Sequence, residues 1–443
     1  MRRTAAMVVS VVGLVIVMLV TGAVIGGLGR PTAPANGNAR DVAAQPAQVM
    51  GGADIAGAIV SLQTRLRTVP RDWSSWASLG ALYTAQARLT ADPSYYGKAD
   101  GAFAKSLQIK PKDNAAALSG QAALASSRHD FTGALALTKK VEKLNAYSTP
   151  NLGVMVDALV ELGRYPEAFA TLQRMVNLKP GVASFARISY SYELRGDITG
   201  ARYALDQTLA VAQSPSDRAF ALQYLGELAF NHGDLATAQR QFVLGLRQDA
   251  GYMPLLAGRA RVEAAQGKTA AAIRDYGSVV ARLPQPSYLI EYGDLLASLG
   301  RHQEAVTQYA VVGAEEKLFM AAGVNVDLEL ALFDADHGRS AAAFISATAE
   351  WDRRKSVLVE DAYAWALHVN GRDKEALVHA KGAARTGMAN ALFAYHRGMI
   401  EKSLGLDAAA TTSLKRALQI NPYFSTLLAP TARAALRSLE KAR

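Results

Sequence analysis

One interval recurs along most of this chain and constrains its fold more than any other feature. Eight glycines succeed one another along the chain at steps of 33, 37, 34, 33, 38, 33 and 34: Gly163, Gly196, Gly233, Gly267, Gly300, Gly338, Gly371 and Gly405. His129 stands one further step before Gly163 (163 − 129 = 34) and continues the series. A period of about 20 to 50 residues is the signature of stacked units that bury their apolar faces against each other. The 443 residues therefore predict a repeat array in place of one globular core.

The same two small side chains accompany each position of this series. Five residues later stands alanine in every case: Ala134, Ala168, Ala201, Ala238, Ala272, Ala305, Ala343, Ala376 and Ala410. Seven residues earlier the side chain is small except at Val156: Ala122, Ser189, Gly226, Ala260, Gly293, Ala331, Ala364 and Gly398. Helix axes approach to about 8 Å only where the side chains between them are small. Each interval therefore predicts two helices joined by a glycine turn.

The first unit carries a longer motif. Trp76-x-x-Leu79-Gly80-x-x-Tyr83 is followed by Ala99-x-x-x-Phe103 and Pro111, and Leu225-Gly226 with Ala238-x-x-x-Phe242 repeats part of it. This motif resembles the tetratricopeptide repeat (TPR) signature. The resemblance implies an all-α, right-handed superhelical solenoid of about ten TPR-like hairpins over residues 70–425. Membrane-tethered bacterial proteins of this family commonly serve envelope or cofactor-protein assembly, so it also implies a scaffold.

The N-terminus predicts a membrane anchor. Arg2 and Arg3 precede an uncharged apolar run over residues 4–29, which Arg30 ends. About 20 apolar residues span the roughly 30 Å of bilayer hydrocarbon. We therefore expect a transmembrane helix within residues 1–30, a single-pass protein of the bacterial cytoplasmic membrane and an extracytoplasmic C-terminal domain. Cleavage after Ala33-Pro34-Ala35, which would release a secreted protein, stays open as the alternative.

The remaining segments complete the predicted organisation. Residues 31–53 are rich in Ala, Pro and Gly and predict a flexible spacer. A helix over residues 54–69 and another over residues 426–443 would cap the two ends of the array. The two long steps place insertions near residues 214–216 and around Gly313 to Asn325.

The sequence favours binding over catalysis. It contains no P-loop, no GxSxG and no HExxH motif, and no cysteine. We therefore predict no enzyme activity and no cofactor, unless the irregular segment from Gly313 to Asn325 builds a pocket. The net charge of +10 is spread along the chain without a basic stripe, so no nucleic-acid partner is expected.

The expected binding surface is the concave face, which the first helix of each hairpin would line. Residues six and nine or ten before each turn glycine should face inward. They are Arg187, Tyr190, Tyr224, Glu227, Arg261, Glu291, Asp294, Asp361, Trp365, His396 and Met399. Aromatic anchors with charged neighbours suit a protein or peptide partner. The Lys and Asn positions by which some TPR proteins grip chaperone C-termini have no counterpart here.

A second hypothesis makes the chain a sensor of a small ligand or a divalent metal ion. The string from Asp327 to His337 also contains Glu329, Asp334 and Asp336, and carboxylates with imidazole suit such an ion. Only Asp334 and His337, at i and i+3, share a helix face. These two are the candidate ligands under that hypothesis.

Overall fold

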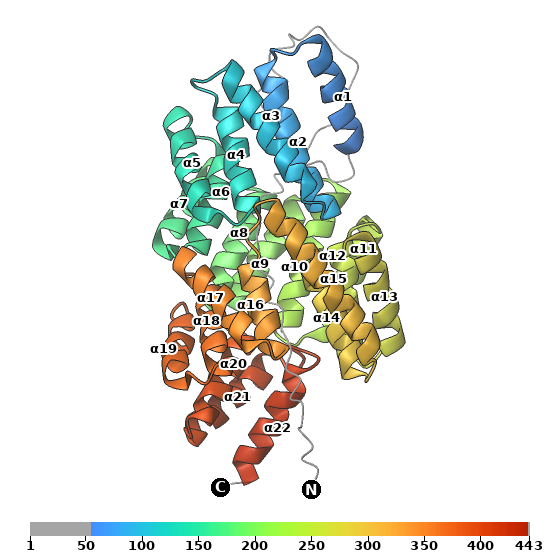
Figure 1. The fold of residues 1–443 in the computed structure, drawn as a ribbon, viewed down its shortest axis with the longest axis vertical. Helices are drawn as coiled ribbons and strands as arrows, with labels where there is room; N and C mark the ends of the chain where they lie inside the picture. The colour runs from blue at the N-terminus through green and yellow to red at the C-terminus, as the bar shows by residue number, and fades with distance from the viewer. Residues whose placement is uncertain (1–54, 442–443) are drawn as a thin grey trace.

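A computed structural model describes residues 55–441, which form 22 helices and no strand (Figure 1). Helices α1 (Ile55–Thr68) and α22 (Leu428–Lys441) stand at the two ends. The twenty helices between them pair as ten hairpins: α2 (Trp73–Thr90) with α3 (Ser94–Ile109), α4 (Ala115–Ser127) with α5 (Phe131–Leu144), α6 (Thr149–Glu161) with α7 (Tyr165–Leu178), α8 (Val182–Glu193) with α9 (Ile198–Val211), α10 (Pro215–Asn231) with α11 (Leu235–Gln248), α12 (Met253–Ala265) with α13 (Thr269–Arg282), α14 (Pro286–Ser298) with α15 (His302–Ala321), α16 (Asp327–Asp336) with α17 (Ser340–Arg353), α18 (Val357–Val369) with α19 (Asp373–Ala383), and α20 (Ala391–Ser403) with α21 (Asp407–Ile420).

The hairpins form as the spacing predicts. All eight turn glycines adopt a left-handed conformation with φ between +71° and +77°, and His129 takes the same place at φ +60°. The alanines five residues later are buried without exception. At Gly226 an added Cβ would overlap the ring of Phe242, because the two helices cross there at their closest. The predicted all-α repeat solenoid is thus confirmed.

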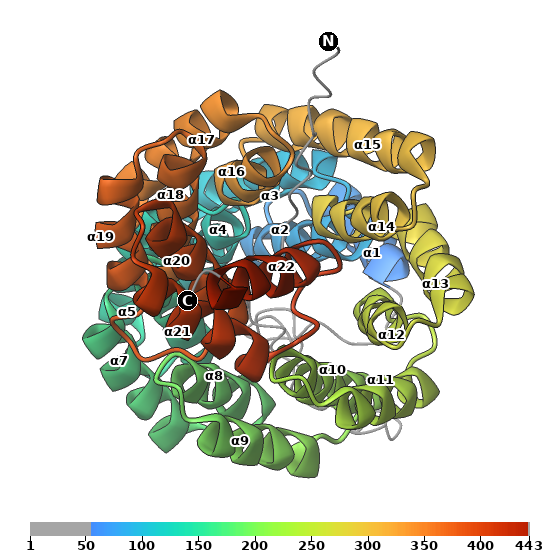
Figure 2. The ribbon, with the colours of Figure 1, turned by 90° about the horizontal axis from the view of Figure 1, so that it is seen from below.

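The hairpins stack into a right-handed superhelix. Seen from the C-terminal end, the chain runs counter-clockwise toward the viewer from α3 through α7, α9 and α13 to α15, and then passes over its own start (Figure 2). In the hairpins from α8 to α19, the first helix lies on the inner side and the second helix on the outer side (Figure 2). We call helices α2 to α13 the first coil and helices α14 to α22 the second coil.

The second coil rests on the first along a continuous line of contacts, which we call the seam. The turns of the first five hairpins meet, in order, the loops that precede α14, α16, α18, α20 and α22. The paired residues are Ala91 with Leu283, His129 with Asn325, Gly163 with Lys355, Gly196 with Gly387, and Gly233 with Pro422. His129 Nδ1 donates to the Asn325 carbonyl at 2.6 Å, and Asn421 Nδ2 donates to the Phe230 carbonyl at 2.9 Å.

A buried ion cluster fixes the middle of the seam. Arg354 of the second coil pairs with Glu161 of the first coil and with Glu350, and all three side chains are buried. The Arg354 guanidinium also lies 4.9 Å from the ring centroid of Phe131. Burial raises the pKa of Glu161 to about 7, although Arg354 opposes the shift.

The segment around Gly313 to Asn325, which was expected to be irregular, is mostly helical. Helix α15 continues through Gly313 to Ala321, so the long step there lengthens a helix and only residues 322–326 form a loop. The other long step lengthens α10, which begins at Pro215 behind a Ser214 cap. The predicted membrane span and spacer lie outside the described residues. Between residues 55 and 441 no helix combines the length and apolarity needed to cross a bilayer.

Candidate functional site

The side chains predicted for the concave face are mostly buried, and they connect successive first helices. Arg187 of α8 forms a two-pronged ion pair with Asp157 of α6, with Nε–Oδ1 and Nη2–Oδ2 distances of 2.8 and 2.7 Å. Tyr190 and Tyr224 are buried beside this helix pair. Asp157 stands six residues before Gly163, so the count used for the other residues would also have found it.

Arg261 of α12 joins three hairpins. Its Nη1 lies 2.6 Å from Glu227 of α10, and its Nη2 lies 2.8 Å from Glu291 of α14. Tyr276 donates from its hydroxyl to the other oxygen of Glu291 at 2.9 Å. Burial acts to lower the pKa of Arg261, but the two carboxylates more than offset it and raise that pKa. Arg261 therefore stays charged in the interior.

Asp294 lies next in this series. Tyr309 donates to its Oδ1 at 2.7 Å, and His337 Nε2 lies 3.4 Å from the same oxygen. Its Oδ2 is buried and has no hydrogen-bond partner among residues 55–441. Burial raises the pKa of Asp294, while the contact with His337 opposes that rise.

The two candidate metal ligands turn to different partners. Asp334 Oδ1 accepts from Arg339 Nε at 2.5 Å, whereas His337 Nδ1 faces the Phe333 carbonyl at 2.7 Å and its Nε2 faces Asp294. In the part of the chain that the structure describes, no group of three or more His, Asp or Glu side chains could hold a metal ion.

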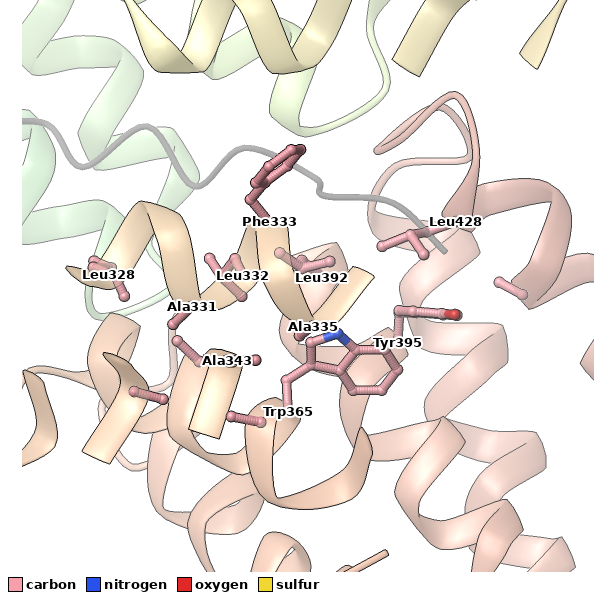
Figure 3. Packing of buried hydrophobic residues seen from close by; sticks show 14 of the residues in the cluster. Leu328, Ala331, Leu332, Phe333, Ala335, Ala343, Trp365, Leu392, Tyr395 and Leu428 are labelled. Atoms are coloured by element: carbon pink, nitrogen blue, oxygen red, sulfur yellow. The ribbon is translucent and has the colours of Figure 1, made fainter. Parts of the chain in front are cut away.

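A polar cluster in the second coil gathers three more of the predicted residues. Trp365 donates to Asp336 Oδ1 at 2.6 Å and stacks on His396, whose Nδ1 lies 2.8 Å from Asp361. Figure 3 shows Trp365 among Leu332, Ala335, Leu392 and Tyr395. Met399 packs against the edge of the same core. Burial raises the pKa of Asp336 to about 7.

The joint between α8 and α10 differs from the others. Glu193 of α8 is buried, its Oε1 has no hydrogen-bond partner, and no ion pair reaches it from the described residues. Burial, followed by the nearby Glu227 carboxylate, raises the pKa of Glu193 to about 8. Sequence reasoning missed Glu193, because its position three residues before Gly196 carries no repeated charge.

Three of the residues predicted for the concave face line a cavity. A cavity of about 330 Å³ lies between α12, α13 and α14 on one side and the α21–α22 loop with the start of α22 on the other. Arg261, Glu291 and Asp294 line it. Aromatic and polar side chains complete the lining: Phe230, Tyr276, Tyr423, Phe424, Ser425 and Arg433.

A second cavity, of about 370 Å³, lies where the first hairpin meets α14, α15 and α16. Its walls include Ile290, Val312, Phe319 and Leu330. Glu329 also lines it and has a buried oxygen to which no described residue offers a hydrogen bond. Burial raises the pKa of Glu329 to about 7. The segment around Gly313 to Asn325 thus contributes to a pocket through helix α15.

Solved structures of TPR proteins are among those that the comparison with this chain finds. A tetratricopeptide repeat protein from Parabacteroides merdae is similar at 16% identity and a TM-score of 0.34, over 58% of this chain and 98% of that one. A thermophilic TPR protein from Thermus thermophilus is similar at 21% identity and a TM-score of 0.38, over 43% of this chain and 98% of that one. The human IFIT1 dimer with PPP-AAAA is similar at 14% identity and a TM-score of 0.45, over 83% of this chain and 87% of that one. No family model and no curated protein matches the sequence.

Proposed function

We propose that this protein is a membrane-tethered bacterial scaffold or assembly factor that binds a polypeptide and carries out no covalent chemistry. The binding place is the cavity of about 330 Å³ between helices α12 to α14 and the α21–α22 loop. The observation that carries the proposal is the meeting of charged and aromatic side chains there. Arg261, Glu291 and Asp294, which we call the charged floor, line the cavity together with Tyr423 and Phe424.

The cavity suits one or two anchor side chains of a longer segment. A volume of this size holds part of a peptide, and binding energy concentrates where aromatic and charged groups enclose an inserted side chain. The charged floor is held rigid, because Arg261 is fixed by two carboxylates and Asp294 by Tyr309 and His337. A partner therefore meets a preformed surface and loses little affinity to ordering it.

The test is capture of polypeptides by the intact protein, followed by affinity measurements with the partner so identified. Arg433→Ala and Tyr423→Ala alter the mouth of the cavity and should each weaken that partner about tenfold or more. Arg437→Ala is the matched control, since Arg437 is an exposed arginine one turn further along α22 and does not line the cavity. Undiminished affinity of both cavity variants would exclude the cavity. Absence of any retained polypeptide would end the scaffold proposal.

The proposed tether is tested separately. The full chain should remain in the membrane fraction after alkaline extraction, and a chain that begins at residue 31 should not. A reporter enzyme that is active only outside the cytoplasm should be active when it is fused to the C-terminus. Recovery of a shortened chain in the soluble extracytoplasmic fraction would favour the cleaved, secreted alternative.

The second cavity supports a different candidate function, in which an apolar small molecule binds beside α15. Anilinonaphthalene sulfonate, whose aromatic rings fluoresce on apolar surfaces, should bind the intact protein there. Ser287→Phe, which places a ring in the cavity, should abolish the signal. Ser278→Phe on the exposed face of α13 should not. An equal signal from both variants would exclude this cavity.

A further inference from the structure

The seam uses only half of the hairpin turns. The other five, at Gly267, Gly300, Gly338, Gly371 and Gly405, form what we call the turn edge. A Cβ added at any of these five glycines would meet nothing within 4 Å among the described residues. A Cβ added at Gly163 or Gly196 would overlap a carbonyl oxygen of the second coil. The turn edge is therefore the same kind of surface as the seam, left uncovered.

The opposite end of the molecule carries the matching surface. Helices α5, α7 and α9 end in apolar residues beside the loops that follow them, and we call this the loop edge. Leu144, Leu178 and Val211 are 42%, 43% and 40% exposed there. Ile420 holds the same final position in α21, but it lies at the seam and is 7% exposed. The final residue of the helix is thus buried where its loop contacts the other coil, and it is exposed where its loop has no such contact.

The turn edge also exposes apolar side chains. Leu299, directly before Gly300, is 41% exposed, and Leu406, directly after Gly405, is 44% exposed. Leu162 holds the position of Leu299 in the third hairpin, beside the seam, where it packs against the apolar core. A turn-edge leucine is thus exposed where its counterpart beside the seam is packed.

We propose that a second copy of this chain seats its loop edge on the turn edge of the first, head to tail, and so continues the seam between molecules. The two rows match in spacing. Leu144, Leu178 and Val211 succeed one another at steps of 34 and 33, and Gly338, Gly371 and Gly405 at steps of 33 and 34. Each step is one hairpin, so the loops of one copy fall opposite the turns of the other.

The end helices fit the same arrangement. Helix α22 packs on α21 and α20 as the first helix of a further hairpin would, and α1 packs on α2 as a preceding second helix would. Together, α22 of one copy and α1 of the next stand where an eleventh hairpin would lie. A head-to-tail contact does not close on itself, so the assembly grows along the superhelix axis.

The test is the oligomeric state of the full chain, measured by analytical ultracentrifugation at rising concentration. The native protein should form dimers and longer species. The loop-edge variant Leu178→Glu with Val211→Glu, and the turn-edge variant Leu406→Glu, which lies outside the cavity of about 330 Å³, should each lose about tenfold or more in self-association. Ile345→Glu removes an exposed apolar residue from the outer face of α17 and should have no effect.

Mixing the two edge variants provides the decisive measurement. Each variant keeps one intact edge, so the mixture should form a 1:1 dimer and nothing larger. A native chain that stays monomeric, or a mixture without a dimer, would overturn the proposal. So would edge variants that lose a different protein partner while self-association persists. Circular dichroism should confirm that all variants fold, because the substituted side chains are exposed.

Discussion

The turns of the first five hairpins and those of the last five have almost the same backbone but different surroundings. Gly163 and Gly371 both have φ +74°. Gly163 lies against the Lys355 carbonyl of the second coil, whereas Gly371 has open space beside it. A seam turn such as Gly163 therefore needs glycine for two reasons, the left-handed backbone conformation and the close contact with the second coil. The comparison shows that identical repeat positions acquire different constraints once the superhelix has completed a coil.

Removing the Arg354 guanidinium from the middle of the seam should have the largest effect, because it weakens the contact between the two coils. Arg354→Ala leaves Glu161 buried without its ion-pair partner and leaves Glu350 with Arg353 alone, which should lower the free energy of unfolding by about 3 to 5 kcal/mol. Arg353→Ala removes the partly exposed ion pairs with Glu350 and Asp327 but leaves Arg354 in place, so it should cost less, about 1 kcal/mol. Denaturant titration measures both. Hydrogen exchange at the Val357 amide, which donates to Tyr165 across the seam, should accelerate only for Arg354→Ala.

The second prediction concerns how stability depends on pH through Glu193, three residues before the seam turn at Gly196. Glu193 has a pKa of about 8, against an ordinary value of 4.5. Between pH 4.5 and 8 the folded state therefore binds more protons than the unfolded state, and stability falls as pH rises. Glu193→Gln should remove that slope and raise stability at pH 8 by about 3 kcal/mol, with little change at pH 5.

Glu227→Gln is the matched control for this experiment. Glu227 is also buried, but it pairs with Arg261, so its replacement should destabilise the protein at both pH values. Thermal unfolding at pH 5 and pH 8 distinguishes the two carboxyl groups. An unchanged pH slope in Glu193→Gln would show that Glu193 is not the buried acid responsible.

The third contrast compares the two glycines directly. Gly371→Ala should cost about 1 kcal/mol, since alanine is strained at this φ. Gly163→Ala should cost about 2 kcal/mol more, because its methyl group also overlaps Lys355. Equal losses in denaturant midpoint would mean that the seam is not closed in solution.

The smallest effect concerns the residue after the turn. Asp130, Asp197 and Asp234 cap the helices that follow three turns of the first five hairpins, whereas Lys268 makes no side-chain cap for α13. Lys268→Asp should stabilise the protein by about 0.5 to 1 kcal/mol. Asp234→Ala should destabilise it by a similar amount. A lower melting temperature for Lys268→Asp would contradict this assignment.

Sequence reasoning identified the hairpins and missed much of the site. The small residues before and after each turn report contacts within a single hairpin, and those contacts recur in every unit. The concave-face positions were chosen by the same count, yet most of their side chains are buried in pairs such as Arg187 with Asp157. Their part in binding a partner stays a prediction. Only Arg261, Glu291 and Asp294 among them line the cavity of about 330 Å³.

The sequence by itself determined the repeat, because a tight turn and a close helix crossing need glycine and alanine at fixed places. The tertiary structure alone decided which turns are covered, which acids are paired and where cavities open. Contacts such as Arg354 with Glu161 join residues 193 positions apart. They depend on the pitch of the superhelix, which is the sum of small rotations between successive hairpins. No local pattern records that sum.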